Sequence, residues 1–334
     1  MMQLRLQFQE NPVADDVSAV IAVARPILEG LLYALKKDVA DLVGGYEKVT
    51  LSALARLYRP GDRDCGICFE YAVHEALNRG EPTVVERLDD AMRIYCNMRG
   101  SRPESILFGL EKAGALNLID TAKERLTDDS RLLAGYRGQP AKLKRHIDSI
   151  AAAFRKKEAR DALPWSIAGL WKADLFVGRT DIDRWIATTV KINPANLESA
   201  RGLRIGIVPT REGRGDNIRL DEALNLVVCP LPHDQSFMEV FYQGWGVVRQ
   251  FLTADGKLPR EAALPRAADR QVARELEARR DFTVVEVIDV LRALAQPELF
   301  TTRPHEAVLV SRRETNPEVE TGAVVAPMPR TTGA

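Results

Sequence analysis

The chain has 334 residues, of which 46% are apolar and 28% charged, and its 47 basic residues balance 47 acidic ones. These values are typical of a globular protein with one large domain or two ordinary ones, and they give no global signal for binding a polyanion. Four dispersed cysteines exclude a disulfide framework and are typical of reduced thiols. The first residues lack the apolar segment of a signal peptide, and the longest apolar run near the start is too short to cross a bilayer. We therefore expect a cytoplasmic protein without a membrane span.

The first part of the chain, residues 1–160, is predicted to be mainly helical. Apolar residues recur at three-to-four spacing over 15–24 and 27–39, with Pro26 as a break or kink between the two helices. A short helix is expected over 51–58 behind Thr50. The same pattern predicts later helices, separated by glycines, at 86–98, 103–113 and 116–126. Their residues indicate a packing layer.

The stretch 59–80 is the first one with chemically informative residues. A charged Pro-Gly loop leads into a predicted helix that carries Glu70 and His74 side by side, four residues apart. Cys65 and Cys68 form a CxxC pair, which is typical of a zinc half-site or a redox pair. Structural zinc needs two further ligands in a similar knuckle, and the sequence offers no second pair. A zinc site is therefore not expected.

The residues Cys65–Phe69, CGICF, also resemble the signature of papain-like cysteine proteases. The resemblance implies that Cys68 is a nucleophile activated at the start of a helix. Asp62 stands where the glutamine of the oxyanion hole is expected, and His233 lies in a segment unlike the histidine strand of that family. A cysteine hydrolase thus stays as one alternative.

A local excess of basic charge follows between residues 131 and 160, where nine basic residues face two acidic ones. A basic segment inside a neutral chain is a candidate for binding a polyanion, although a solvated helix flank explains the same composition. The sequence contains neither of the glycine-rich phosphate loops of nucleotide-binding folds, so we do not expect an NTPase or a dinucleotide-dependent enzyme. The candidate nucleic-acid-binding residues are Lys144, Arg145, Arg155, Lys156 and Lys157.

The stretch 171–209 organises the rest of the chain. Runs at 173–177, 185–192 and 203–208 are rich in β-branched and aromatic residues and predict three strands. Asp174 interrupts the first run, and Lys191 lies near the end of the second, seventeen residues later. Because side chains on a strand alternate between faces, a carboxylate and an ammonium on paired strands can converge on one point. A cross-strand ion pair at the edge of the sheet explains the same residues.

The remainder of the chain is predicted to add elements around this sheet. A further strand is expected at 223–228, a long helix at 236–252 and another helix at 282–294, whereas 253–280 is polar and broken by prolines. Residues 311–334 are charged, dotted with prolines and poor in large apolar residues, which predicts a disordered tail. These patterns suggest a mainly helical region at 1–160, a mixed-sheet core with C-terminal helices at 161–310 and the tail.

The order of these elements resembles the PD-(D/E)XK superfamily of restriction-endonuclease-like nucleases. Gly66–Glu70 matches a helix motif GxxFE, Asp174 matches the strand carboxylate, and Thr189-Val190-Lys191 matches the tripeptide on the next strand. The resemblance implies an α/β fold with a restriction-endonuclease-like mixed sheet. It also implies Mg²⁺ or Mn²⁺ held by Glu70 and Asp174, with Lys191 as the third catalytic residue. Hydrolysis of DNA, in restriction or anti-phage defence, would be the function, with other subunits of a defence complex or a second copy as partners.

One position departs from the family pattern. Thr189 stands where the tripeptide has Asp or Glu, and a hydroxyl is a neutral and weaker metal ligand. Either Glu70 and Asp174 bind the metal with help from the Val190 carbonyl, or the core is degenerate. In the second case the chain is a non-catalytic scaffold or partner subunit that binds protein or nucleic acid.

Overall fold

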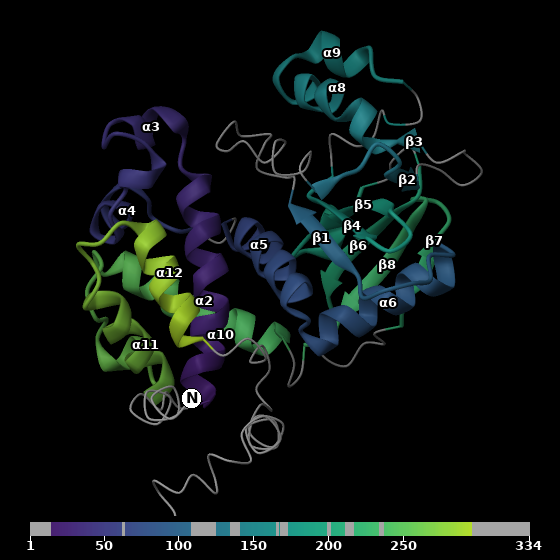
Figure 1. Ribbon diagram of the computed structural model, residues 1–334. Helices are drawn as coiled ribbons and strands as arrows, with labels where there is room; N and C mark the ends of the chain where they lie inside the picture. The colour runs from purple at the N-terminus through teal and green to yellow at the C-terminus, as the bar shows by residue number, and fades with distance from the viewer. Residues whose placement is uncertain are drawn as a thin grey trace, which may run out of the picture.

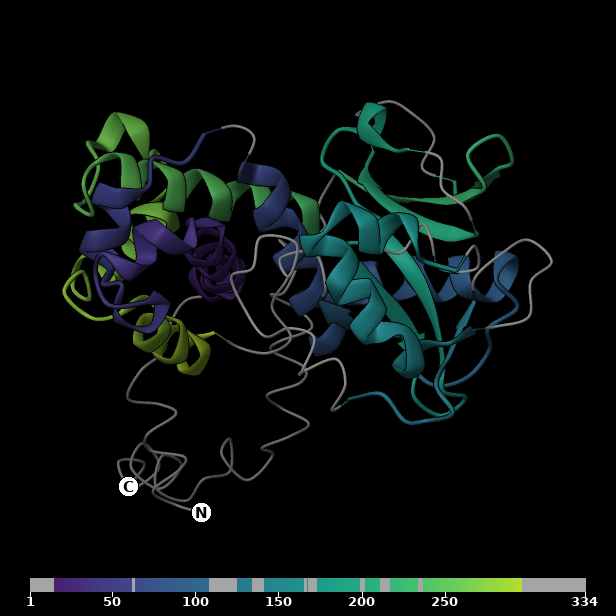
Figure 2. The same ribbon diagram turned by 90° about the horizontal axis from the view of Figure 1, so that it is seen from above.

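The computed structural model describes residues 15–61, 64–107, 125–133, 141–164, 167, 173–198, 202–210, 217–233 and 237–295. In these residues the chain forms a lobe of packed helices and a lobe built on a mixed β-sheet, with α5 (Asp64–Arg79) lying between them in both views (Figures 1 and 2). The fold is mixed α/β, as the sequence predicted.

The helical lobe is arranged around α2 (Asp15–Ala34), which α5, α10, α11 and α12 surround (Figure 1). The apolar periodicity of α2 predicted two helices separated at Pro26, but the helix runs through this proline. The lost backbone hydrogen bond is offset by burial, because nearly every side chain from Val17 to Leu32 is buried. The apolar segment of α2 has the length and composition to cross a membrane, and 83% of it is buried within the protein.

The other elements of this lobe include two helices whose starts are capped by local side chains. Thr50 Oγ1 accepts a hydrogen bond from Ala53 N (3.1 Å), as its position before a predicted helix suggested, and Thr283 forms a capping box with Glu286. The elements are α3 (Lys37–Asp41), η1 (Tyr46–Lys48), α4 (Leu51–Leu57), α10 (Phe237–Thr253), η5 (Glu261–Ala263), α11 (Ala267–Glu277) and α12 (Val284–Leu294).

The sheet has the strand order β1-β4-β5-β6-β8-β7, and β2 pairs with β3 and with the first half of β5. The β4–β5 hairpin is antiparallel, whereas β5, β6 and β8 run parallel to one another. The strands are β1 (Glu104–Leu107), β2 (Arg131–Leu133), β3 (Ala141–Lys142), β4 (Leu175–Arg179), β5 (Arg184–Val190), β6 (Arg204–Pro209), β7 (Arg219–Asp221) and β8 (Leu226–Leu231).

The two faces of the sheet have different coverings. One face, the α5 face, packs on α5 and α6 (Pro82–Tyr95) and shares a continuous core with the helical lobe through Ile186, Ile205 and Val227. The opposite α8 face carries two separate apolar clusters. Helix α8 (Leu143–Arg155), followed by α9 (Lys157–Asp161), covers the first cluster around Trp185, and the second consists of buried residues of β6 and β8.

Several sequence predictions differ from the structure. Within the helix expected at 103–113, Glu104–Leu107 form strand β1 because they pair with β4, and 108–113 lie outside the described residues. Helix α11 lies in the segment that the sequence indicated to be irregular. Strands β1, β2 and β3 fall before residue 160 but belong to the sheet, and α10–α12 pack on α2, so the two lobes do not divide at that residue. The expected helix at 116–126 lies mostly, and the expected tail at 311–334 wholly, outside the described residues.

Candidate functional site

Helix α5 places Glu70 beside the end of β5. Gly30 of α2 permits the close approach of α5, because a Cβ at this position would lie 3.3 Å from the Tyr71 ring and 3.4 Å from Cys68 Cα. Phe69 is fully buried and packs against Phe241, with ring centroids 5.2 Å apart. Tight packing on both sides of the helix fixes its rotation, so that Glu70 is directed away from this core and keeps 12% of its side chain exposed.

His74, one turn beyond Glu70, belongs to a buried polar cluster that anchors α5 to β1. Its Nδ1 shares a hydrogen bond of 2.7 Å with the Ser105 hydroxyl, and Ser105 N donates to Asn78 Oδ1 (2.9 Å). Burial lowers the pKa of His74 to about 3, so the ring is neutral. This histidine therefore positions the helix and carries no charge into the site.

Asp174 lies one residue before β4, where its backbone N–H still donates to Thr188 O (2.9 Å). The side chain is 5% exposed, and its Oδ2 accepts hydrogen bonds from Thr189 Oγ1 (2.9 Å) and Val190 N (2.9 Å). Thr189, at the position where the family has an acid, therefore holds this carboxylate. An oxygen that accepts several hydrogen bonds is fixed in place and favoured in its charged form.

Lys191 connects the two carboxylates. Its Nζ lies 2.8 Å from Asp174 Oδ2 and 3.5 Å from Glu70 Oε1, so the three side chains predicted from sequence converge on one point. Burial lowers the pKa of the ammonium, but the charges of Asp174 and Glu70 outweigh it and raise the pKa above its usual value. Lys191 is thus a permanent cation, and 30% of its side chain reaches solvent.

Arg204 is a second cation beside Asp174 that the sequence analysis did not identify. It begins β6 and is 3% exposed, and burial lowers its pKa although the charges of Asp174 and Glu198 oppose this shift. Its position at the start of an apolar run was a visible signal, because a charged residue is rarely buried without a partner. Lys191 contacts both carboxylates at this end of β5, and Arg204 adds a second positive charge that acts on Asp174.

The donor set meets only the minimum for a divalent metal. Among the described residues no group of three or more His, Cys, Asp or Glu side chains is arranged to hold a metal ion. Mg²⁺ is commonly bound by one or two carboxylates together with waters, and Glu70 and Asp174 supply two carboxylates from separate elements. Glu70 and Asp174 are therefore the residues here that could hold such an ion.

The cysteine alternatives do not agree with the structure. All four cysteines are free, and Cys68 is fully buried with its thiol directed to Ile27 O (3.7 Å). Burial raises the pKa of the Cys68 thiol, whereas a nucleophilic cysteine needs a lowered one. His233 instead stacks on Tyr242, with ring centroids 5.1 Å apart, and Asp62 lies outside the described residues. Cys68 is therefore a core residue.

The predicted basic residues lie on α8 and α9, which cover the opposite face of the sheet from α5. Lys144 pairs with Asp128 at 3.4 Å, whereas Arg145, Lys156 and Lys157 are exposed, and Arg155 ends α8. The helix buries Ile147 and Ile150 against the cluster around Trp185, so its charged residues are left on the outer side. The geometry is compatible with a basic surface and with a solvated flank.

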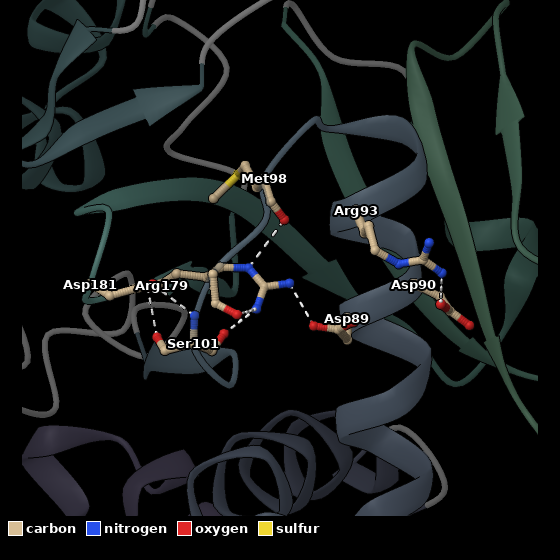
Figure 3. A network of polar contacts seen from close by, with 8 residues as sticks. Asp89, Asp90, Arg93, Met98, Ser101, Arg179 and Asp181 are labelled. Atoms are coloured by element: carbon tan, nitrogen blue, oxygen red, sulfur yellow. Dashed lines mark hydrogen bonds and ion pairs between the residues drawn. The ribbon is translucent and has the colours of Figure 1, made fainter.

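A separate ionic network occupies the other end of the β4–β5 hairpin. Arg179, at the end of β4, is 1% exposed and donates to the carbonyls of Met98, Gly100 and Ser101 and to Asp89 (2.6 Å), as Figure 3 shows. It fixes the loop between α6 and β1 against the sheet. No sequence pattern indicated this role.

Comparisons with family models, with curated proteins and with solved structures gave no match to this chain.

Proposed function

We propose that this protein is a metal-dependent phosphodiesterase that cleaves DNA at the site formed by Glu70, Asp174 and Lys191. The observation that carries the proposal is the position of Lys191 Nζ, 2.8 Å from Asp174 and 3.5 Å from Glu70. Carboxylates from two elements and a lysine that meet at a partly exposed point are the groups that phosphodiester hydrolysis requires.

The order of elements supports a restriction-endonuclease-like core. Helix α5 with Glu70 precedes the sheet, Asp174 lies at the start of β4, and Lys191 follows the antiparallel β5. The next strand, β6, is parallel to β5. The link between β5 and β6 includes the short 3-10 helix η4 (Pro194–Asn196).

Each side chain has a defined task in this proposal. A bound Mg²⁺ or Mn²⁺ ion would supply positive charge to a phosphate oxygen and lower the pKa of an attacking water. Glu70 and Asp174 would hold that ion, while Thr189 Oγ1 and Val190 N keep the Asp174 carboxylate in place. Lys191, freed from Glu70, would act as a point cation for the phosphate in the transition state.

The surroundings of the site suggest how DNA would bind. The exposed basic residues of α8 and α9 would contact phosphates, which contribute affinity without sequence specificity. Free cysteines are in keeping with a reducing compartment, and a cytoplasmic location is part of the proposal. A role in restriction or anti-phage defence, with partner subunits or a second copy, belongs to the same proposal.

The direct experiment measures cleavage of plasmid and single-stranded DNA with Mg²⁺ or Mn²⁺ and with EDTA. We expect activity only with the metal and a loss of at least about 100-fold in Asp174→Asn and Glu70→Gln. The matched control is Asp181→Asn, which changes a carboxylate that accepts two hydrogen bonds from Ser101 at the opposite end of the same hairpin. Undiminished cleavage in EDTA, or equal loss in the control, would refute the site.

A second candidate function is a non-catalytic scaffold with a degenerate nuclease-like core. Asp174 Oδ2 already accepts from Thr189, Val190 and Lys191, and Arg204 adds a further positive charge nearby. A site whose charges are balanced attracts a divalent cation weakly. If Mn²⁺ leaves the melting temperature of the wild-type protein unchanged at millimolar concentration and no DNA is cleaved, the scaffold is the better description.

A further inference from the structure

A cavity of about 300 Å³ lies on the α8 face of the sheet, over β6, β8 and β7. Its floor is formed by Val208 and Val228, and its wall includes Pro194 and Leu197 from the link between β5 and β6. The volume is at the lower end of the range for small-molecule sites.

The cavity shares one face of the sheet with Asp174. The pairing register places Thr189 opposite Gly206, Gly206 opposite Val228, and Val228 opposite Arg219, in one row across four strands. The hydroxyl of Thr189 contacts Asp174, so this row leads from the candidate site into the cavity. Because neighbouring strands are about 4.8 Å apart, Val228 lies about 10 Å from Thr189.

The link between β5 and β6 connects the site and the cavity physically. Pro194, which lines the cavity, follows Lys191 by three residues. Leu197 packs over Gly206, where an added Cβ would lie 3.0 Å from Leu197 Cδ2 and 3.0 Å from Leu226 Cδ2, so a larger residue would have to push these side chains aside. A group bound in the cavity would therefore touch the same segment that carries the catalytic lysine.

The chemistry of the lining combines apolar walls with a few polar groups at one side. Three prolines and the aliphatic side chains offer flat apolar surfaces, while Thr210, Arg219 and Asp221 supply donors and acceptors. The guanidinium of Arg219, on an exposed residue, is suited to a phosphate. Thr210 Oγ1 donates to Leu231 O (3.1 Å) and Asp221 Oδ1 accepts from Leu224 N (3.1 Å), so the hydroxyl oxygen and the second carboxylate oxygen are suited to accept hydrogen bonds from the polar edge of a base. This combination matches a nucleotide better than a purely apolar or a purely anionic ligand.

We propose that the cavity is a subsite for one nucleoside of the DNA strand that is cleaved, close to the scissile phosphate. The inference rests on the proposed function and adds a substrate class to it. A base in a duplex is stacked and paired and cannot enter such a cavity unless it is extruded, at a cost in unstacking energy. The preferred substrate is therefore single-stranded or locally unpaired DNA.

The test uses the full chain with 13C-labelled methyl groups and each of the four deoxynucleoside 5′-monophosphates as probes. We expect nucleotides to shift the methyl signals of the cavity residues Leu197, Val208 and Val228, and inorganic phosphate alone to leave them unchanged. Arg219→Gln should weaken nucleotide affinity about 10-fold, as the loss of a charge-assisted hydrogen bond predicts. The matched control, Arg56→Gln, removes an exposed arginine from α4 in the helical lobe and should have no effect.

A second variant tests the cavity through its volume. Leu224 is half-buried at the rim, and Leu224→Trp would fill the cavity from that side. The filled variant should lose the nucleotide-induced shifts and cleave single-stranded DNA less well, while its melting temperature stays close to that of the wild type. If this variant does not fold, the Arg219→Gln titration decides alone.

The outcomes separate this inference from the proposed function. DNA cleavage by the wild type without any nucleotide-induced shift in the cavity overturns the subsite and leaves the nuclease intact. Shifts caused equally by inorganic phosphate reduce the cavity to an anion site and also overturn the inference. Specific nucleotide binding without cleavage in Mg²⁺ supports a nucleotide cavity in a protein that is not a nuclease.

Discussion

The two ends of the β4–β5 hairpin carry ionic networks of opposite design. At one end Arg179 is 1% exposed, and its guanidinium donates to three backbone carbonyls and to Asp89 (Figure 3). At the other end Lys191 is 30% exposed and bridges Asp174 and Glu70, the second at the longer distance of 3.5 Å. The loop between α6 and β1 surrounds the guanidinium of Arg179, whereas the side chain of Lys191 is partly exposed to solvent.

This difference in burial and in hydrogen-bond partners distinguishes a structural ion pair from a candidate functional site within one hairpin. A buried and fully bonded arginine stabilises the fold, and nothing can replace its partners without leaving polar groups unpaired. A partly exposed lysine between carboxylates from two elements can exchange a partner for a ligand at small cost. The two networks should therefore respond in opposite ways to mutation.

The largest contrast is expected for Lys191→Met. This change removes the cation but keeps the length of the side chain, so cleavage should fall by about 100- to 1,000-fold while the protein stays folded. Glu70 then loses its ion pair and Asp174 keeps only the charge of Arg204 nearby, so Mg²⁺ should raise the melting temperature of the variant more than that of the wild type. Calorimetry with and without Mg²⁺ beside a cleavage assay measures both effects. A variant with full activity would reduce Lys191 to a structural ion pair.

The converse is expected for Arg179→Met. Loss of the guanidinium leaves the carbonyls of Met98, Gly100 and Ser101 without their donor, which should cost about 3–5 kcal/mol of unfolding free energy. Below the unfolding transition, the variant should bind divalent ions as the wild type does. Urea unfolding gives the free energy. A loss of unfolding free energy below about 1 kcal/mol would mean that the Arg179 network contributes little to the stability of the fold.

A third prediction concerns the pH dependence of the stability of the protein. Glu81 caps α6, which also carries Asp89, and it is 2% exposed with Oε1 lacking a hydrogen-bond partner among the described residues. Burial raises its pKa from 4.5 to about 7, despite the hydrogen bond from Val84 N. The stabilisation from its protonated form is complete below pH 4.5 and is lost as pH rises through 7.

Glu81→Gln should therefore remove part of the pH dependence. Between pH 5 and 8 the wild type should lose up to about 3 kcal/mol of stability relative to the variant, in urea unfolding at both pH values. The matched control is Glu286→Gln at the start of α12, where hydrogen bonds from Thr283 lower the pKa of an exposed carboxyl. The Glu286→Gln control should lose as much stability between pH 5 and 8 as the wild type does. If the unfolding free energies of the wild type and Glu81→Gln change with pH in the same way, the prediction is contradicted.

The smallest effect is expected on the basic surface of α8 and α9. Lys156 and Lys157 are exposed at the junction of these helices. If they contact phosphates, replacing both with Gln should lower the slope of log affinity against log salt by about one per contact and leave turnover unchanged. Fluorescence titrations with DNA from low to moderate salt measure the slope. An unchanged slope identifies a solvated helix flank.

Local patterns of residues determined much of the sheet and its hairpin. The three apolar runs rich in β-branched residues became β4, β5 and β6, and Thr50 capped the helix that follows it. The spacing of Asp174 and Lys191 placed them near the same end of a hairpin, because alternation along a strand is a property of the backbone itself. The α5 helix and its Glu70 also followed from periodicity.

Only the tertiary structure decided which further residues join these elements. Ser105–Leu107 form a strand because β4 offers them a pairing edge, although their sequence predicted a helix. The charge of Arg204 acts on Asp174 because β6 lies beside β5, and Leu197 lines the cavity because the segment after Lys191 folds over Gly206. Each of these depends on contacts between residues far apart in the chain, and local propensity contains no information about such contacts.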